Sequence, residues 1–478
     1  MKINNLLNTV YNLSKKKKLK VYIVGGFIRD YLLKKPLEEI KDLDFAVFGN
    51  TIKFAKEFSK TVKGSLVILS EKFQLVRVIV NKVYTCDFTH GKGKNILHDL
   101  KERDFTINSL AVDINHKDEI KEYIIDKFNS KKDLKKKFIK EINKKIYFKD
   151  PVRLLRAIRF SATLKFNIAK KTKNHIKEFA NLITYSSRER IRDELFKILE
   201  VNNSFKYIKL LDKLTLLENI FPDIKTMKGV EQPGYHHLDV WGHSLETLKN
   251  LELIIKKIDL NLPQNIKENI CNHLNKKIGG FCKLSLLKLI SLFHDIGKPE
   301  TKFVDKDGHT HFYYHENVGM NKFSKIGREL KLSNKEIKIG KIIIKNHLRV
   351  GYLCDLKKIT KKAVRKFLRD CGDLTIDVLL LSLSDRLSAK GVKVDEKIIN
   401  EHKKVIEKLF VEYYKVTIST PLPKLINGYD LMKKFNLKPS PLIGALLDKV
   451  KEAQELKKIS TRKQAWALVK LAIGAKIA

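Results

Sequence analysis

The chain has 478 residues, more than a single typical core holds, and its length favours about three domains. Its 97 Lys and Arg residues outnumber 54 Asp and Glu residues, and the net charge of +43 favours a polyanionic partner such as nucleic acid. Much of the excess is lysine in a sequence also rich in Ile and Asn, so the base composition of the genome is an alternative explanation for the charge. Five scattered cysteines argue against a disulfide framework, and no apolar run approaches a membrane span, so we expect a cytoplasmic protein without membrane segments.

The order of strand-like and helix-like patterns predicts an α+β fold. Short β-rich runs alternate with helical stretches in the first part of the chain, and helical periodicity follows, with looser segments near 257–280 and 414–424. We therefore predict a mixed α/β head and an all-helical remainder. The predicted domains are a head (1–128), a helical neck (129–230), a body (231–410) and a helical tail (411–478).

An acidic pair on the second strand of the head is the first candidate site. Residues two apart on a strand point to the same face, so Asp42 and Asp44 share one face while Leu43 and Phe45 take the other. Two adjacent carboxylates repel each other unless cations lie between them, and a pair of Mg²⁺ ions is the usual arrangement for phosphoryl transfer. We therefore predict that this pair holds Mg²⁺ and is catalytic.

The turn before that strand has the composition of a phosphate-binding loop. Gly25 and Gly26 would let backbone N–H groups approach a triphosphate closely, and Arg29, one helical turn later, could contact phosphate. Asp87, on the last strand-like run, is a candidate third acidic group near the metals, or simply an aspartate at a strand end.

Three later motifs extend the pattern: HDLKERDFTINSLAVD (98–113), DPVRLLRAIRF (150–160) and RERIRDELFKIL (188–199). With the Gly-Gly and Asp-Leu-Asp elements, their order and spacing resemble the bacterial-type tRNA nucleotidyltransferase and poly(A) polymerase family, which includes the CCA-adding enzymes. The resemblance covers about the first two hundred residues. It implies a template-independent nucleotidyltransferase that acts on tRNA with CTP and ATP.

The resemblance assigns nucleotide contacts to Arg103 and Asp104, with the aspartate favouring the ribose 2′-hydroxyl. Glu102 departs from the family pattern, in which a second arginine is usual, and this puts one phosphate-side contact in doubt. The segment between Asp87 and Asp99 is also shorter than the flexible loop of many CCA-adding members. Short loops accompany partial activities in the family, so the nucleotides added stay open.

The segment after residue 149 presents a polar side that could read a base. Asp150 is expected to cap a helix that begins at Pro151, with Arg153, Arg156 and Arg159 on the polar side of that helix. A carboxylate accepts and a guanidinium donates, so an Asp–Arg pair matches the base edges of cytosine and adenine but not those of uracil and guanine. The family uses the corresponding pair in this way. A capping aspartate beside a solvated face is the alternative, and Lys149, where glutamate is usual, could relax the discrimination.

The second half of the chain resembles an HD-type metal phosphohydrolase. Six residues match the ligand order of that domain: His243, His294, Asp295, His315, His347 and Asp385. Imidazole with carboxylate suits a divalent transition metal or Mg²⁺, and Lys298 could hold a substrate phosphate. If active, such a site would remove cyclic or terminal phosphates from RNA ends. The tail segment 421–450 resembles the C-terminal element of family members that carry this domain.

The leading hypothesis is a CCA-adding or CC-adding tRNA nucleotidyltransferase. A poly(A) polymerase of the same family shares the head and neck motifs. An HD phosphohydrolase with an RNA-binding head is a further alternative, and a purely RNA-binding protein leaves both groups of carboxylates unexplained. The oligomeric state cannot be inferred from the sequence.

Overall fold

The computed structural model describes residues 3–356, 359–392, 394–418, 423–456 and 458–477. Its internal contacts divide the chain into two compact units, Met1–Ile220 and Phe221–Ala478, each of which is described by itself. The first unit holds the predicted head and most of the predicted neck, and the second holds the HD-like motifs. Pro421 and Leu422, the first two residues of the segment 421–450 that resembles the C-terminal element of the family, lie outside the described residues.

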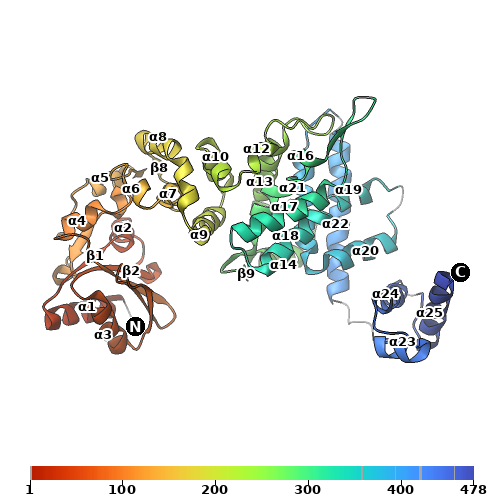
Figure 1. Cartoon of the computed structure of the whole chain (residues 1–478), viewed down its shortest axis with the longest axis horizontal. Helices are drawn as coiled ribbons and strands as arrows, with labels where there is room; N and C mark the ends of the chain where they lie inside the picture. The colour runs from red at the N-terminus through yellow and green to blue at the C-terminus, as the bar shows by residue number, and fades with distance from the viewer. Residues whose placement is uncertain (1–2, 357–358, 393, 419–422, 457, 478) are drawn as a thin grey trace. The chain divides into compact units, whose positions relative to one another are not determined.

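The first unit is built on a six-stranded sheet with the order β3-β4-β5-β2-β1-β6 (Figure 1). The β2–β5 pairing is parallel, and the other neighbours are antiparallel. The strands are β1 (Lys20–Val24), β2 (Asp42–Phe48), β3 (Ser65–Ser70), β4 (Leu75–Val80), β5 (Tyr84–His90) and β6 (Ala111–Asp113). The alternating runs of the sequence predict the first five strands, whereas the three-residue β6 is too short to be recognised by alternation.

Helices complete this unit and cover the apolar face of the sheet. Phe45 of β2 stacks on Phe88 of β5 with ring centroids 5.1 Å apart, and Phe88 packs against Phe54 and Phe58 of α3. Each fully buried ring of this kind contributes about 1.5–3 kcal/mol. The helices are α1 (Ile3–Lys17), α2 (Gly26–Leu32), α3 (Thr51–Val62), α4 (Ile96–Lys101), α5 (Ser130–Lys135), α6 (Ile146–Lys149), α7 (Arg153–Leu164), α8 (Lys170–Glu178), α9 (Arg188–Leu199), α10 (Phe205–Lys213) and α11 (Leu216–Ile220).

The predicted fold class, a mixed α/β head followed by a mostly helical chain, is confirmed. The neck is not purely helical, because β7 (Phe138–Ile139) pairs in parallel with β8 (Asn167–Ile168). Lys165 adopts the left-handed conformation with φ 57° and ends α7, so the chain turns and brings the second strand beside the first. These two strands, of two residues each, are too short to produce a recognisable alternation in the sequence.

The second unit is helical, with two short hairpins. The helices are α12 (Ile224–Met227), α13 (Val240–Lys256), α14 (Gln264–Asn275), α15 (Lys283–Phe293), α16 (Lys298–Thr301), α17 (His315–Glu329), α18 (Asn334–Asn346), α19 (Arg349–Cys354), α20 (Lys361–Cys371), α21 (Thr375–Ser388), α22 (Glu396–Ile418), α23 (Gly428–Phe435), α24 (Pro441–Glu455) and α25 (Arg462–Ile477). The hairpins are β9 (Lys277–Ile278) with β10 (Phe281–Cys282), and β11 (Lys302–Val304) with β12 (Thr310–Phe312). Thus α14 lies in the segment 257–280, for which the sequence predicts less regular structure. Helix α22 spans the predicted boundary between body and tail, at residues 410 and 411.

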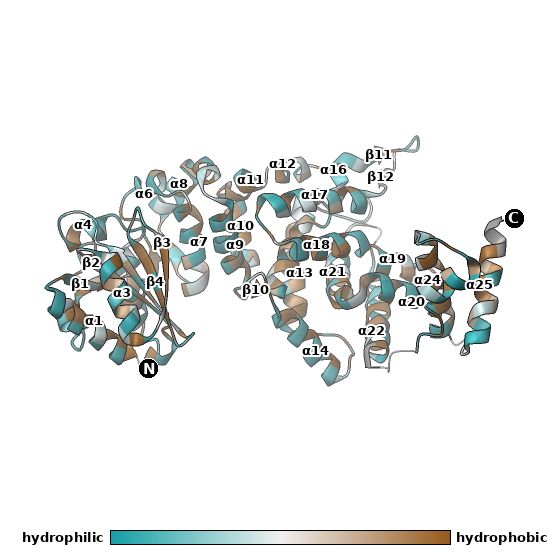
Figure 2. Cartoon of the chain, turned by 60° about the horizontal axis from the view of Figure 1, so that its bottom comes forward, coloured by the Kyte–Doolittle hydropathy of each residue, from teal (hydrophilic) through white to brown (hydrophobic). Residues whose placement is uncertain are grey.

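Helices α15 and α21 lie at the centre of the second unit. Their apolar residues, such as Leu289, Ile290, Leu379 and Leu380, are fully buried, as expected for helices that are apolar on several sides. The outer helices carry apolar residues on one side and polar residues on the other (Figure 2). No helix in the described ranges combines the length and apolar content needed to cross a bilayer.

Candidate active site and metal centre

The acidic pair of the head lies on one face of β2, as the alternation predicts. Leu43 and Phe45 are buried on the opposite face. Asp44 is paired in register with Asp87 on the neighbouring strand β5, and Asp42 lies beside Thr85. Paired residues on adjacent strands project to the same side, so the three predicted carboxylates share one face of the sheet.

The groups around Asp44 change the pKa of its carboxyl in opposite directions. Burial raises the pKa of its carboxyl, Asp87 and Asp42 raise it further, and Arg103 opposes these effects. A cation beside Asp44 would therefore stabilise the charged form. Carboxylate oxygens are the hard ligands that Mg²⁺ prefers, so the donor set fits a divalent ion.

Asp87 is less available than the other two aspartates. Both of its oxygens accept hydrogen bonds from Arg77 of β4, each at 2.8 Å. Arg77 lies directly opposite Asp87 in the antiparallel β4–β5 pairing, so the bidentate pair follows from strand register. A metal ligand role for Asp87 would require it to share these oxygens with the guanidinium. Sequence reasoning missed Arg77, although its place on an alternating strand was a signal.

The Gly-Gly turn lies directly against the acidic face. Gly25 has φ +71°, and a Cβ atom at this position would lie 3.0 Å from Asp44 Oδ2 and 3.2 Å from Arg103 Nη1. Glycine is therefore required by both conformation and space. The backbone N–H of Gly26 donates to Asp44 Oδ2 at 3.4 Å. Arg103 is itself held by Asp99, whose Oδ2 accepts from its Nε at 3.0 Å and Nη2 at 2.9 Å.

Arg29 and Asp104, two predicted nucleotide-binding residues, form hydrogen bonds within the protein. Asn108 links them, because its Oδ1 accepts from Arg29 Nη1 at 2.8 Å and its Nδ2 donates to Asp104 Oδ1 at 3.0 Å. Asp104 is buried and also accepts from Arg156 Nε at 2.9 Å. Burial alone would raise the pKa of Asp104, but Arg156 and Asn108 hold it well below its usual range. Any contact between these residues and a ribose or phosphate would add to this network.

We expect Asp104→Asn to lower the local free energy of unfolding around α7 by about 1–3 kcal/mol at pH 7, because a buried charged hydrogen-bonding group is neutralised beside Arg156. Since the pKa of Asp104 is depressed in the folded state, its contribution is present above pH of about 4 and is lost as the pH falls through the folded-state pKa. Hydrogen exchange of the Phe105 and Asn108 amides measures this difference. The exposed Asp118→Asn change is the control, and an equal effect of both variants would contradict the expectation.

The predicted cap at Asp150 is wrong. Helix α7 begins at Arg153, and Asp150 instead ends α6. Its carboxylate forms a bidentate pair with Arg190 of α9, at 2.9 and 2.8 Å, because the guanidinium offers two donors where the start of α7 would offer one. Arg190 lies in the motif 188–199 but was not singled out as a site residue.

The other side chains of the predicted base-reading surface lie close to Asp150. Arg153 Nε is 3.7 Å from Asp150 Oδ2, and Arg153 Nη2 donates to the backbone oxygen of Glu102 at 3.1 Å. Arg153 Nη1 is buried with no hydrogen-bond partner among the described residues. Arg159 donates to Glu194 Oε2 at 2.7 Å. Of the three arginines, only Arg153 therefore keeps a buried donor free near Asp150.

The two departures from the family pattern contact each other. Lys149 Nζ lies 2.5 Å from Glu102 Oε2. Both side chains are partly exposed, so the pair contributes at most about 1 kcal/mol. It nevertheless ties the loop before Arg103 to the end of α6, on either side of the Arg153 contact.

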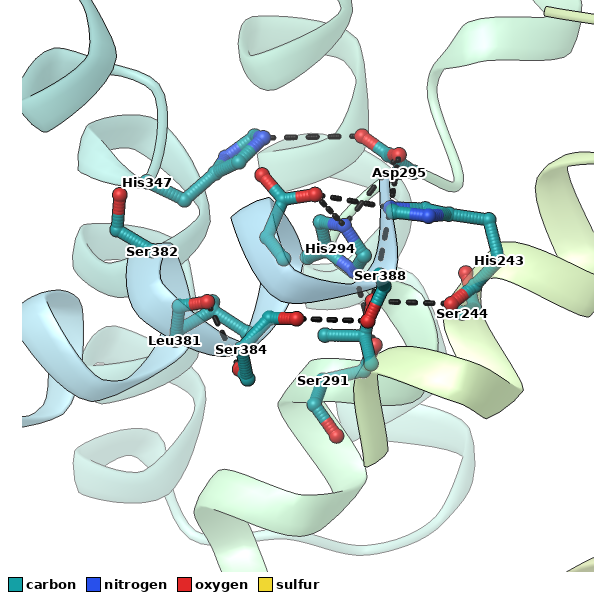
Figure 3. A network of polar contacts seen from close by, with 12 residues as sticks. His243, Ser244, Ser291, His294, Asp295, His347, Leu381, Ser382, Ser384 and Ser388 are labelled. Carbon is teal, nitrogen blue, oxygen red and sulfur yellow. Dashed lines mark hydrogen bonds and ion pairs between the residues drawn. The ribbon is translucent and has the colours of Figure 1, made fainter. Parts of the chain in front are cut away.

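The six predicted ligands of the HD-like site come together in the second unit. They form three overlapping groups of ligand atoms within 4.8 Å of one another, namely His243, His294 and Asp295, then His294, His347 and Asp385, then Asp295, His315 and His347. Figure 3 shows His243, His294, His347 and Asp295 pointing toward a common centre. His243 Nε2 is 2.9 Å from Asp385 Oδ1, and His315 Nε2 is 3.2 Å from Asp295 Oδ1.

Several atoms at this centre fit a metal ion. Nε2 of His294, His315 and His347 and Oδ1 of Asp295 are buried and have no hydrogen bond within the described part of the chain. Buried polar atoms that lack hydrogen bonds are costly, so a bound cation would account for them. Burial opposes protonation of His294, yet Asp295 and Asp385 raise its pKa to about 10. The carboxylates of Asp295 and Asp385 therefore favour a positive charge at the centre of the cluster.

Backbone carbonyls fix the orientation of three of the four rings. The Nδ1 atoms of His294, His315 and His347 lie 2.8, 2.7 and 2.6 Å from the carbonyl oxygens of Ser291, Phe312 and Ile344, each three residues earlier. An Nδ1–H that donates to a carbonyl leaves the lone pair of Nε2 toward the centre. This arrangement prepares each Nε2 for a metal.

His243 differs, because its Nδ1 lies 3.2 Å from Nδ1 of another histidine, His236. Burial, and then Lys298, lower the pKa of His236 to about 2, so its ring is neutral and can accept from His243. Sequence reasoning missed this contact, although His236 lies in the same motif. Lys298 is itself buried, 2.6 Å from both Asp295 Oδ2 and Gln232 Oε1.

We expect His236→Phe to weaken metal binding at this site by about 10–100-fold, as is typical when the partner of a ligating imidazole is removed. The ring volume is roughly kept, whereas the acceptor for His243 Nδ1–H is lost. Equilibrium titration of metal-free protein with Mn²⁺ measures the effect. His237→Phe, at the exposed neighbouring position, is the matched control, and equal Mn²⁺ affinities of the two variants would count against the role of His236.

Comparison with known proteins agrees with this organisation. Family models match residues 21–140 ("Poly A polymerase head domain"), 165–228 ("Probable RNA and SrmB-binding site of polymerase A"), 240–390 ("HD domain") and 388–471 ("tRNA nucleotidyltransferase domain 2 putative"). The A-adding tRNA nucleotidyltransferase of Deinococcus radiodurans is 28% identical over 94% of each chain. The CC-adding tRNA nucleotidyltransferase of Thermus thermophilus is 26% identical over 93% of this chain and 92% of its own.

Solved structures share the fold. A CCA-adding enzyme in complex with CTP superposes with a TM-score of 0.65 at 21% identity, covering 99% of both chains. The Thermotoga maritima CCA-adding enzyme in complex with tRNA gives a TM-score of 0.62 at 22% identity, covering 98% of this chain and 95% of its own.

Proposed function

Because the chain belongs to the bacterial-type tRNA nucleotidyltransferase and poly(A) polymerase family and carries its HD domain, we propose that it adds C and A nucleotides to the 3′ end of tRNA without a template. The observation that carries the proposal is the shared face of Asp42 and Asp44 directly behind the Gly25–Gly26 turn. The relatives that add C, A or both support the same chemistry.

In the proposed reaction the 3′-hydroxyl of the tRNA attacks the α-phosphate of CTP or ATP, and pyrophosphate leaves. Asp42 and Asp44 would hold Mg²⁺, which lowers the pKa of the attacking hydroxyl and neutralises the charge of the triphosphate. Asp87, whose carboxylate is paired with Arg77, would add its negative charge to that of Asp42 and Asp44 on this face. The close approach allowed by Gly25 would place the triphosphate near Arg103.

Choice of the base is proposed for the Asp150 region. Arg153 keeps one buried guanidinium donor free, and the Asp150 carboxylate lies 3.7 Å from its Nε. Together they offer an acceptor beside a donor, the pattern that matches cytosine and adenine. Arg190, through its bidentate contact, would hold Asp150 in place.

The experiment that tests the proposed activity supplies CTP and ATP, separately and together, to tRNA that ends before the first C of its 3′ end and to tRNA that already ends in CC. Incorporation of C, and of A only after C, supports a CCA-adding enzyme. C alone supports a CC-adding enzyme, and A alone on tRNA that already ends in CC supports an A-adding enzyme. Repeated A addition to arbitrary RNA would instead identify a poly(A) polymerase and overturn the proposal.

A second activity is proposed for the HD domain, because its buried histidines and aspartates fit a metal ion. The substrate would be a phosphate ester at an RNA 3′ end, such as a 2′,3′-cyclic phosphate. Water would break the P–O3′ bond, which frees the 3′-hydroxyl that nucleotide addition requires and leaves the phosphate on the 2′-oxygen of a cyclic ester, or as inorganic phosphate from a 3′-monoester. The alternative is a protein whose main activity is this hydrolysis and whose head only binds RNA. The acidic pair at Asp42 and Asp44 argues against that alternative.

A further inference from the structure

A hollow of about 690 Å³ lies between α17 and α18 in the second unit, whereas the proposed nucleotidyl-transfer site belongs to the first unit. The two helices pack side by side (Figure 1). Its charged lining residues are Arg328 of α17, Lys338, Lys341 and Lys345 of α18, Arg349 of α19 and Asp370 of α20. We call this surface the α17–α18 groove.

The charge of the groove is one-sided. Its single acidic residue, Asp370, is paired with Arg349 at 2.8 Å. No ion pair involves Arg328, Lys338, Lys341 or Lys345 in the part of the chain that the structure describes. Lysine is common throughout this chain, so charge alone would not single out a surface. Here, however, four unpaired cations line one concavity, where their potentials add.

The spacing of the lysines suits an extended polyanion. Lys338, Lys341 and Lys345 recur at three and four residues, so they lie along one side of α18 and span about 10 Å. Lys338 and Lys345 are exposed, and Lys341 is half-buried. The exposed amide of Asn334, at the start of α18, also lines the hollow and can donate to and accept from ribose hydroxyls. A strand of RNA presents phosphates and 2′-hydroxyls in such a row.

The same helix connects the groove to the metal cluster. Asn346 lines the groove, and the next residue, His347, points to the cluster with its Nε2 3.6 Å from Asp295 Oδ1. RNA held along α18 would therefore be fixed relative to the HD site. Consecutive residues at the end of α18 thus line the groove and the cluster.

We propose that the α17–α18 groove binds the sugar–phosphate backbone of the tRNA, through Lys338, Lys341, Lys345 and Arg328. This inference rests on the proposed function in that tRNA is the substrate. It adds an RNA-binding surface within the HD domain, outside the residues 165–228 that match an RNA-binding model.

The test compares two triple variants with equal charge change. Lys338→Glu/Lys341→Glu/Lys345→Glu alters the groove, and Lys397→Glu/Lys404→Glu/Lys408→Glu alters exposed lysines of α22 in the same unit. The equilibrium dissociation constant for tRNA is measured without nucleotide at several salt concentrations. Each lost phosphate contact lowers the slope of log K against log salt by about 0.7–0.9, so the groove variant is expected to lose about 2 units of slope and at least tenfold in affinity.

The outcomes separate three cases. A groove variant that matches the α22 variant in slope and affinity would overturn the proposal, while wild-type protein that fails to bind tRNA would overturn the proposed function itself. Inorganic triphosphate is titrated as well, because a site for a small polyanion would lose triphosphate binding and keep its tRNA slope. That result would also overturn an RNA groove. Hydrolysis of bis-para-nitrophenyl phosphate is expected to be unchanged, which shows that the unit remains folded.

Discussion

Replacing Asp42 and Asp44 together by asparagine is expected to lower the rate of nucleotide incorporation into tRNA by about a thousandfold or more. Metal-held charge stabilisation contributes several kcal/mol to phosphoryl transfer, and each change of about 1.4 kcal/mol in the barrier is tenfold in rate. Asparagine keeps the shape of both side chains but removes the negative charges. The measurement is single-turnover incorporation of labelled CTP.

The same variant is expected to fold normally. Burial and the neighbouring aspartates raise the pKa of Asp44, so its charged form is unfavourable in the metal-free fold. Neutralising it should leave the free energy of unfolding unchanged or slightly higher, as is common where function and stability conflict. Asp118→Asn, at an exposed position of the head, is the matched control. Wild-type rates in the double variant would eliminate the assignment of these two carboxylates.

His294→Ala is expected to remove the metal of the HD domain and to lower hydrolysis of bis-para-nitrophenyl phosphate to below about one hundredth of the wild-type rate. His294 takes part in two of the three overlapping ligand groups and is completely buried. Its loss also removes one cationic neighbour from Asp295 and Asp385. Elemental analysis of the purified protein and the hydrolysis assay measure the two effects.

His309→Ala provides the control for this prediction. His309 belongs to an exposed group with Asp305 and Asp307, in the loop between β11 and β12. We expect its replacement to change neither metal content nor hydrolysis. Nucleotide incorporation should be normal in both variants, because the proposed transfer site lies in the other unit. Full metal content in His294→Ala would contradict the ligand assignment.

The sequence predicts those parts of the two sites that depend on local pattern. Strand alternation places Asp42 and Asp44 on one face, and the Gly-Gly turn precedes them along the chain. The six HD-like residues are recognised by their order, and the structure brings them together. These inferences succeed because each depends on spacing within one element or on a family motif.

Partners that come from distant elements are not predictable in this way. Asp150 pairs with Arg190, forty residues away, instead of capping a helix. The contact between Glu102 and Lys149 depends on the packing of α6 against a loop. His236 supports His243 only because a turn brings the two rings together. Such choices are made by tertiary packing, which overrides local preference.

A crystal structure of the protein with Mn²⁺ and a CTP analogue that cannot be cleaved tests most directly whether Asp42 and Asp44 hold the metal ions for nucleotidyl transfer. We expect anomalous Mn²⁺ density beside both carboxylates, with the triphosphate against the Gly25–Gly26 turn. A nucleotide and Mn²⁺ bound elsewhere in the head, with both carboxylates free of metal, would contradict it.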